Sequence, residues 1–118
     1  MEKLALAWPD PEGVKELGTF LLPSGERVIL GTARFPQGRL IPERGFSLHQ
    51  GSELSLLLEG SLEVEVEGRE TGDIIRAGEV TFIPAGVPHR AKVLQPTLLV
   101  WVWIETGREE DGQADIVD

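Results

Sequence analysis

Apolar positions along this chain recur in short runs separated by turn residues, and no long stretch follows a helical period. The clearest run is residues 61–67, where Leu62, Val64 and Val66 alternate with glutamates at the positions between and after them. An alternation with a period of two predicts a strand with one buried and one solvated face. We expect the glutamate face to be solvated and to oppose association between strand edges.

The remaining short runs predict further strands. The predicted strands cover residues 19–22, 27–35, 39–41, 53–58, 61–67, 74–76, 80–83, 89–94 and 97–104, with turns at 59–60 and 95–96 among others. One helical turn is expected at residues 12–17, capped by Asp10 and Pro11 and ended by Gly18. Eight or more short antiparallel strands predict an all-β fold that closes into a barrel, because closure removes unpaired sheet edges.

The length of 118 residues predicts one domain, with a core at about residues 19–104 and an acidic C-terminal tail at 105–118. The net charge of −9 disfavours nucleic acid and anionic membranes as partners. The longest apolar run, residues 98–104, is too short to span a bilayer, and the N-terminal run is too short for a signal peptide. We therefore expect a cytoplasmic protein. The absence of cysteine and asparagine is a weak sign of a thermophilic source.

The two histidines of the chain, His49 and His89, suggest a site. Glu53 follows His49 by four residues, so in an extended segment Ser47, His49, Gly51 and Glu53 would share one face. A second imidazole could then reach the pair from a neighbouring strand. These residue types predict either a metal centre or a proton-transfer site.

Two motifs resemble those of the cupin superfamily. In the first, His49, Glu53 and Gly60 stand at the family's spacing, and the second is matched by Gly78, Pro84, Gly86 and His89. The resemblance covers about residues 39–104. The chain departs from the family pattern at three positions: Ser47 replaces the first histidine, Ile41 the opening glycine and Val93 the closing asparagine.

The resemblance implies a double-stranded β-helix, or jelly-roll, barrel with metal ligands at His49, Glu53 and His89. Two imidazoles and one carboxylate suit a divalent transition metal, namely iron, manganese, nickel or zinc. Glu53 is also a candidate catalytic residue, since it could leave the metal and serve as a base. The alternative interpretation is that both histidines are buried, hydrogen-bonded residues of a barrel that has lost its metal.

Two functions follow from these interpretations. The first is a metal-dependent enzyme that acts on a small molecule inside the barrel, as an oxygenase, isomerase or lyase. The second is a non-catalytic barrel that binds a small ligand or senses it. We also expect a homodimer, in which residues 4–22 could add a strand to the partner. Trp101 and Trp103 are expected to pack in the core or at the dimer contact, with a stacking wall for a ligand as the alternative.

Overall fold

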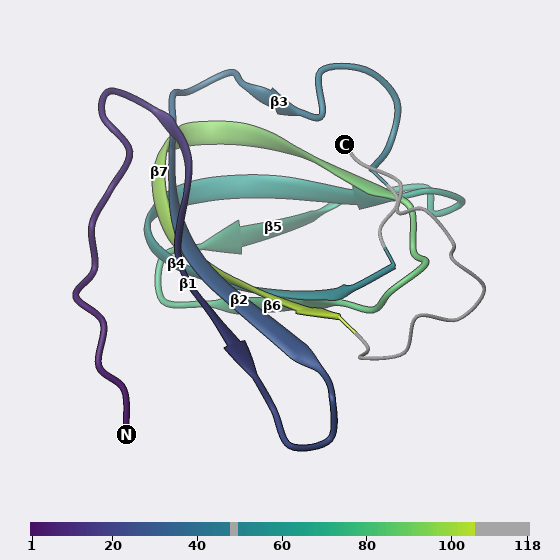
Figure 1. Ribbon diagram of the computed structural model, residues 1–118. Coiled ribbons are helices and arrows are strands. Elements are labelled where there is room, and N and C mark those ends of the chain that lie inside the picture. Colours follow the sequence, from purple (N-terminus) through teal and green to yellow (C-terminus); the bar gives the residue numbers. More distant parts are fainter. Residues whose placement is uncertain (48–49, 106–118) are drawn as a thin grey trace.

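The computed structural model describes residues 1–47 and 50–105, which form an all-β fold whose strands curve around a common interior (Figure 1). In these two ranges there is no helix that is long and apolar enough to cross a membrane. The strands are β1 (Gly13–Leu21), β2 (Arg27–Phe35), β3 (Leu40–Ile41), β4 (Ser52–Val66), β5 (Asp73–Arg76), β6 (Val80–Ile83) and β7 (His89–Glu105).

The two long strands, β4 and β7, connect two layers of the barrel. They pair with each other along most of their length. The N-terminal half of β4 also pairs with β6, and the C-terminal half of β7 pairs with β2, which in turn pairs with β1. The other halves of β4 and β7 pair with β5 and β3. Each long strand therefore contributes to both layers, and the interior lies between them.

Both long strands continue through positions where the sequence predicted turns, so those two predictions are wrong. Gly60 lies within β4 at φ +89°, and the β4–β7 register shifts three times between Leu57 and Leu62. A glycine in the left-handed region suits a β-bulge as well as it suits a turn. Pro96 lies opposite the bulge and is tolerated there, since ladder hydrogen bonds are interrupted. Because the predicted strands at 53–58 and 61–67 form one strand, as do those at 89–94 and 97–104, the described residues contain seven strands where eight or more were expected.

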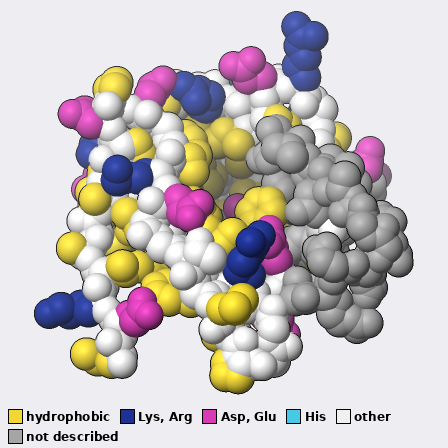
Figure 2. All heavy atoms as spheres, viewed as in Figure 1, with side chains coloured by type: hydrophobic (Ala, Val, Ile, Leu, Met, Phe, Trp, Pro, Cys, Tyr) yellow, Lys and Arg dark blue, Asp and Glu magenta, His cyan; other side chains and the backbone are white. Residues whose placement is uncertain are grey.

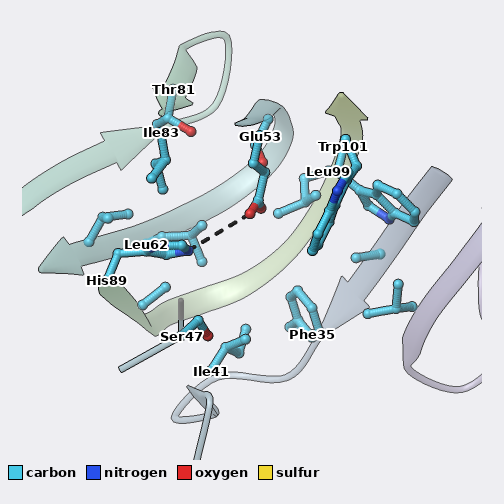
Figure 3. Close-up of a pocket in the computed structure, with 16 residues that line it drawn as sticks. Phe35, Ile41, Ser47, Glu53, Leu62, Thr81, Ile83, His89, Leu99 and Trp101 are labelled. Carbon is cyan, nitrogen blue, oxygen red and sulfur yellow. Dashed lines mark ion pairs between the residues drawn. The ribbon is translucent and has the colours of Figure 1, made fainter. Parts of the chain in front are cut away.

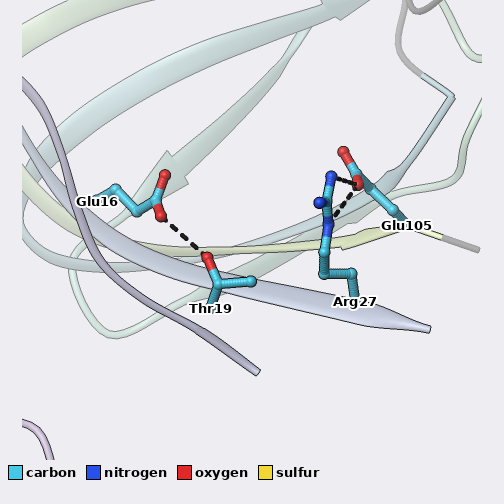
Figure 4. Close-up of polar contacts among 4 residues, drawn as sticks. All are labelled: Glu16, Thr19, Arg27 and Glu105. Carbon is cyan, nitrogen blue, oxygen red and sulfur yellow. Dashed lines mark hydrogen bonds and ion pairs between the residues drawn. The ribbon is translucent and has the colours of Figure 1, made fainter. Parts of the chain in front are cut away.

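The helical turn expected at residues 12–17 is also wrong, because this segment is the start of β1. It pairs with β2 from Gly13 opposite Arg34 to Leu21 opposite Arg27. A single helical turn has few internal hydrogen bonds, so pairing along a whole strand outweighs the local capping signal. A bulge lies between Glu16 and Gly18, and across it Thr19 Oγ1 donates to Glu16 Oε2 at 2.9 Å (Figure 4).

The ends of β2 and β7 are joined by an ion pair. Arg27 and Glu105 lie opposite each other, and Arg27 Nε and Nη2 donate to Glu105 Oε1 at 3.0 and 2.5 Å (Figure 4). The side chain of Arg27 is about half exposed, at 52%. Solvent therefore screens the attraction between the two charges. We expect this ion pair to contribute little to the stability of the protein.

The core lies between the two layers. Its buried residues are Ala33, Phe35, Leu57, Leu62, Val93 and Leu99. The alternation predicted in residues 61–67 is confirmed: Leu62 is buried, Val64 packs against the core, and Glu65 on the opposite face pairs with Arg90 at 2.8 Å.

The N-terminal segment covers the outer face of β2. Thr32 Oγ1 donates to the carbonyl oxygen of Ala7 at 2.6 Å, and Arg34 Nε donates to that of Pro9 at 2.9 Å. Thr32 is fully buried beneath this segment. Within the single chain, the residues expected to reach a partner therefore lie along their own sheet.

Candidate functional site

A cavity of about 300 Å³ lies inside the barrel. Figure 2 shows apolar side chains gathered around a hollow near the middle of the face in view. Five polar residues line the cavity: Ser47, Glu53, Ser55, Thr81 and His89. The remaining lining residues are apolar: Val14, Ala33, Phe35, Ile41, Leu62, Val64, Ile83, Ala91, Leu99, Trp101 and Trp103.

Glu53 and His89 project toward each other inside this cavity (Figure 3). Glu53 lies near the start of β4 and His89 is the first residue of β7, and the distance from His89 Nε2 to Glu53 Oε1 is 3.8 Å. The side chain of His89 is 10% exposed and that of Glu53 is 27% exposed. In the β4–β7 register Glu53 lies opposite Trp103 and His89 lies opposite Val66, so the two residues are at opposite ends of this ladder. They meet because both strands curve from one layer to the other, which makes the two ends face each other across the interior.

The orientation of the His89 ring is fixed by the backbone beside it. His89 Nδ1 lies 2.9 Å from the carbonyl oxygen of Val87. A carbonyl oxygen only accepts hydrogen bonds, so Nδ1 carries the hydrogen and donates it. In the neutral imidazole, Nε2 then has the lone pair that can bind a metal or accept a proton. Nε2 is on the side of the ring that faces Glu53, and in the protonated ring it would form an ion pair with that carboxylate.

Backbone pairing brings Ser47 next to His89. The amide of Ser47 donates to the His89 carbonyl at 2.7 Å, and the amide of His89 donates to the Ser47 carbonyl at 3.0 Å. On the adjoining residues, the Arg90 guanidinium lies 5.1 Å from the ring centre of Phe46, within cation–π range. The segment before residue 48 is therefore attached to the start of β7, and Ser47 lines the cavity at 2% exposure.

Two tryptophans of β7 form part of the cavity wall by lying against glycines. A Cβ on Gly31 would come within 2.1 Å of Trp101 Cζ2, and a Cβ on Gly51 within 2.1 Å of Trp103 Nε1. Trp101 Nε1 donates to the carbonyl oxygen of Thr32 at 2.9 Å, so the polar edge of this indole is used within the sheet. Its ring then serves as an apolar surface toward the cavity.

Of the three predicted ligands, the structure places Glu53 and His89 together, and His49 lies outside the described residues. The extended segment expected from Ser47 to Glu53 is interrupted by a bend at Gln50 and Gly51, yet both of its ends line the cavity. In residues 1–47 and 50–105 no group of three or more His, Cys, Asp or Glu side chains is suited to a metal. The described part of the chain thus supplies two of the three predicted donors.

The donors that are described fit a divalent metal in chemistry and spacing. A neutral imidazole with its other nitrogen bonded to a backbone carbonyl is a common form of a ligating histidine. Donor atoms at about 2.0–2.2 Å from one ion lie roughly 3 to 3.5 Å apart. The 3.8 Å between His89 Nε2 and Glu53 Oε1 is slightly above that range. A small side-chain adjustment would let both groups bind the same ion.

Sequence reasoning missed most of the apolar wall and two of the polar residues. Ser55 shares the face of Glu53 because it is two positions further along β4, and Leu99 shares the face of Trp101 in the same way. The period-two alternation could therefore have identified both. Thr81 and Ile83 reach the cavity through the pairing of β6 with β4, which the sequence alone does not specify.

Comparison with known families agrees with this architecture. A family model described as "Cupin domain" matches residues 31–105, which run from the middle of β2 to the end of β7. A comparison with curated proteins found no significant match.

Several solved structures are similar in fold. An RmlC-like cupin family protein with a double-stranded β-helix fold, from Methanocaldococcus jannaschii, superposes with a TM-score of 0.67 at 12% identity, covering 97% of both chains. KdgF from Halomonas sp. gives 0.61 at 17% identity, over 95% of this chain and 94% of the other. The DMSP lyase DddQ from Ruegeria pomeroyi DSS-3 gives 0.62 at 19% identity, over 92% of this chain but 52% of the lyase. At these identities the likeness shows a shared fold.

Proposed function

Because this chain belongs to the cupin family, with a double-stranded β-helix fold, we propose that it binds a small molecule in its barrel beside a divalent transition metal and is a metal-dependent enzyme. The proposed ligands are His49, Glu53 and His89, with iron, manganese, nickel and zinc as the candidate ions. Oxygenase, isomerase and lyase reactions all fit this ligand set.

The observation that supports this proposal is the meeting of Glu53 and His89 inside an apolar cavity. Two buried or half-buried groups of this kind, 3.8 Å apart and on different strands, are costly to retain for stability alone. Buried ionisable groups in a cavity are more often functional. The hydrogen bond from His89 Nδ1 to the Val87 carbonyl also orients the ring so that Nε2 could bind a metal ion.

Each residue has a role in such a site. When bound, the metal would supply a Lewis acid that polarises an oxygen of the substrate. Val87 holds the His89 ring, and Ser47 holds the backbone of His89 in place. Glu53 is the candidate base, since its carboxylate lies in the cavity beside the space that a substrate would occupy. The apolar walls exclude water, which strengthens electrostatic interactions within the cavity.

Metal analysis of the purified protein tests the proposal. We expect close to one bound transition-metal ion per chain, and loss of that ion in His89→Ala and Glu53→Gln. Glu63→Gln is the matched control, because Glu63 lies on the same strand and is not among the cavity residues. A protein that contains no metal as purified, and takes up none of the four ions after incubation with each, would contradict the proposal.

The second candidate function is a non-catalytic barrel that binds or senses a small ligand. Ser47 favours it, because this residue lines the cavity at the position where the family has its first histidine. The expected result in this case is a protein that binds a ligand with and without metal and turns over none of it. A protein that stays free of metal in the analysis above would favour this second candidate, and an assay of turnover separates the two candidates when metal is present.

We further propose that the protein is a homodimer formed through the outer face of β4, β6 and β7. Cavity residues alternate with outward residues on these strands, so one uncharged patch faces away from the cavity. Its members are Leu54, Leu56, Val80, Phe82, Val100 and Val102, which lie opposite one another in the strand register. Phe82 and Val80 are both 57% exposed. Each chain carries a net charge of −9, so two chains repel each other. This repulsion is smallest if they associate through an uncharged patch such as this one.

Sedimentation equilibrium at micromolar concentration tests the dimer. Leu56→Glu is expected to give a monomer, while Leu40→Glu is expected to leave a dimer, because Leu40 is on β3 in the other layer at a similar exposure, 39% against 37%. A wild-type protein that sediments as a monomer would contradict the proposal. The cytoplasmic location and the thermophilic source stay predictions from the sequence.

A further inference from the structure

The buried and half-buried serine and threonine hydroxyls of the described residues fall into two sets. Members of the first set have hydrogen bonds within the protein: Thr32 to Ala7, Ser52 with the amide of Ala85, and both Ser61 and Thr97 to Gln95. Members of the second set have no hydrogen-bond partner in the described part of the chain, and they are Ser47, Ser55 and Thr81. All three line the barrel cavity. The unpaired hydroxyls of this set are therefore found only where a ligand would bind.

Ser55 and Thr81 are direct neighbours across two strands. Ser55 lies on β4 and Thr81 on β6, and the register places them opposite each other. The Cβ atoms of two such residues are about 4.5–5.5 Å apart. Their hydroxyls do not bond to each other, so both hydrogens are available to a third group in the cavity. One atom between them can lie at about 2.7–2.8 Å from both oxygens.

The Ser55 hydroxyl contributes no hydrogen bond to the fold. This residue is 8% exposed, and its strand neighbours give its side chain no partner among the described residues. A buried polar group without a hydrogen bond is unfavourable, so native proteins satisfy such groups with other groups, water or ligands. A buried hydroxyl that faces a cavity and adds nothing to stability is therefore a candidate for ligand recognition.

The number of hydrogens decides which group fits between the two residues. Ser55 and Thr81 each have one hydroxyl hydrogen to donate. A carbonyl oxygen has two lone pairs and no hydrogen, so it accepts from both. A ligand hydroxyl would bring a third hydrogen, and one of the three would then lack an acceptor within the group. An ammonium group would leave both protein hydrogens without an acceptor. The pair therefore suits a carbonyl oxygen.

The position of the pair relates it to the candidate site. Glu53 lies opposite Ile83, and Ser55 and Thr81 form the next pair of the same register that faces the cavity. Two residues of a strand span about 6.5–7 Å. The part of a ligand that reaches Glu53 would thus be about 7 Å from a carbonyl oxygen held by the pair.

The wall beside the pair suits an apolar ligand body. In the register of β4 and β7, Ser55 also lies opposite Trp101. The Trp101 N–H is bonded to Thr32, so the indole presents carbon atoms to the cavity, and Leu99 and Phe35 lie near it (Figure 3). Such a wall favours an aromatic or aliphatic body. The cavity volume of about 300 Å³ limits the ligand to a small molecule.

We propose that Ser55 and Thr81 form a subsite that binds a carbonyl oxygen, and that the ligand of the barrel is a small carbonyl compound whose apolar body lies against Trp101. This inference rests on the proposed function only in taking the cavity as the binding site. No metal ion takes part in the subsite, and Glu53 and His89 keep the roles given above.

Two probes of the same shape test the proposal: acetophenone, and α-methylstyrene, in which a CH₂ group replaces the carbonyl oxygen. Binding to the protein as purified is measured by calorimetry, with tryptophan fluorescence as a second readout. Ser55→Ala and Thr81→Val are each expected to weaken acetophenone binding at least about threefold, and the double variant at least about fivefold. The affinity for α-methylstyrene, which accepts no hydrogen bond, is expected to change less than about twofold in the same variants.

Ser47→Ala is the matched control, because it removes a similarly buried hydroxyl from another part of the same cavity. The hydrogen bonds between Ser47 and His89 are made by the backbone, so this substitution leaves them in place. We expect the affinity for acetophenone to stay within about twofold of the wild type. A loss as large as that in Ser55→Ala would overturn the proposal. Equal losses for both probes, or no binding of acetophenone to the wild type, would also overturn it.

Urea denaturation without ligand separates a binding role from a structural one. The hydroxyls of Ser55 and Thr81 have no hydrogen bond to lose in the described structure, so the midpoints of Ser55→Ala and Thr81→Val are expected to equal or exceed that of the wild type. A lower midpoint in both variants would assign these hydroxyls to the fold and overturn the proposal.

The results distinguish this proposal from the proposed function. If acetophenone binding depends on Glu53 and His89 but not on Ser55 and Thr81, the metal-dependent function stands and the subsite is lost. If metal analysis finds no bound ion, and the hydroxyl variants still discriminate between the two probes, the subsite stands and the metal-dependent chemistry is lost.

Discussion

The indole of Trp101 lies directly across Gly31 on the neighbouring strand, so that a β-carbon on Gly31 would come within 2.1 Å of Trp101 Cζ2. The two residues are paired in the register of β2 and β7. Glycine in the interior of a strand is weak by itself, and covering it with an aromatic ring restores buried area. This pair places the Trp101 ring, and with it one wall of the cavity.

Gly31→Ala is expected to displace that ring and to destabilise the protein. The added carbon would also come within 2.4 Å of the Lys15 carbonyl oxygen, so neither neighbour can give way without a rearrangement. We expect a loss of about 1–3 kcal/mol in the free energy of unfolding. Chemical denaturation measures this loss, and a shift in tryptophan emission reports the displaced ring.

A double-mutant cycle with Trp101→Leu separates the effect on the ring from the effect on the backbone. If the Trp101 contact dominates, the two substitutions together should cost less than the sum of the single changes. If the two losses in stability are strictly additive, the contact with Trp101 contributes nothing to the destabilisation by Gly31→Ala.

Gly60→Ala is expected to be more destabilising than Gly68→Ala. Both glycines have nearly the same backbone conformation, with φ of +89° and +91°. A Cβ on Gly60 would meet the Pro96 carbonyl oxygen at 2.2 Å, whereas one on Gly68 has nothing within 4 Å. We expect about 1 kcal/mol for the strained φ at each site, and at least about 1–2 kcal/mol more at Gly60 for the clash.

Urea denaturation of the two variants measures that difference. Since Gly68 controls for the left-handed conformation, equal losses in the two variants would mean that the bulge in β4 moves away from Pro96 without cost.

Thr32→Val is expected to destabilise the protein by about 1–2 kcal/mol, because it removes the donor to the Ala7 carbonyl at a fully buried position. The shape of the side chain is nearly unchanged, so the lost hydrogen bond is the main effect. Faster amide hydrogen exchange is expected in the N-terminal segment that this bond holds against β2.

The matched control is Thr19→Val, which removes the exposed hydrogen bond to Glu16. We expect less than about 0.5 kcal/mol there, since water replaces the lost partner. A larger effect at Thr19 than at Thr32 would contradict the role assigned to the N-terminal segment.

Arg27→Met is expected to change the free energy of unfolding by less than about 1 kcal/mol, although it breaks a two-donor contact with Glu105. The Arg27 side chain is 52% exposed, so solvent screens the attraction. Raising the salt concentration to about 1 M should bring the wild type and the variant closer together, since the Debye length is then only about 3 Å. A difference that persists in salt would point to packing of the Arg27 side chain.

Much of this architecture could be predicted from the sequence, and the two wrong turn predictions have a common physical cause. The alternation at Leu62 and Val64 identified a strand and its buried face correctly, because that pattern depends only on the period of a strand. Gly60 and Pro96 were interpreted as turns, because a glycine with positive φ looks the same in a turn and in a bulge. Only the pairing partner, which is remote in sequence, distinguishes them.

The same limit applies to the site. The spacing of the second motif predicts a site residue at His89 and that of the first predicts one at Glu53. Both residues line one cavity, and their roles as metal ligands stay predictions. The third predicted ligand, His49, lies outside the described residues, so its role stays a prediction. Thr81 and Phe35 could not be predicted, because they reach the cavity through the register of β6 and β2 with their neighbours.

The sharing of β4 and β7 between both layers has a consequence for how the barrel comes apart. Neither layer can be peeled away as an independent piece, because each includes half of the same two polypeptide segments. Loss of one half would expose the backbone of the other, so the molecule should melt in a single cooperative step. A molecule that binds in the cavity would then have to enter and leave at the rim of an intact barrel, and we expect its exchange rate to depend on the side chains there and not on separation of the layers.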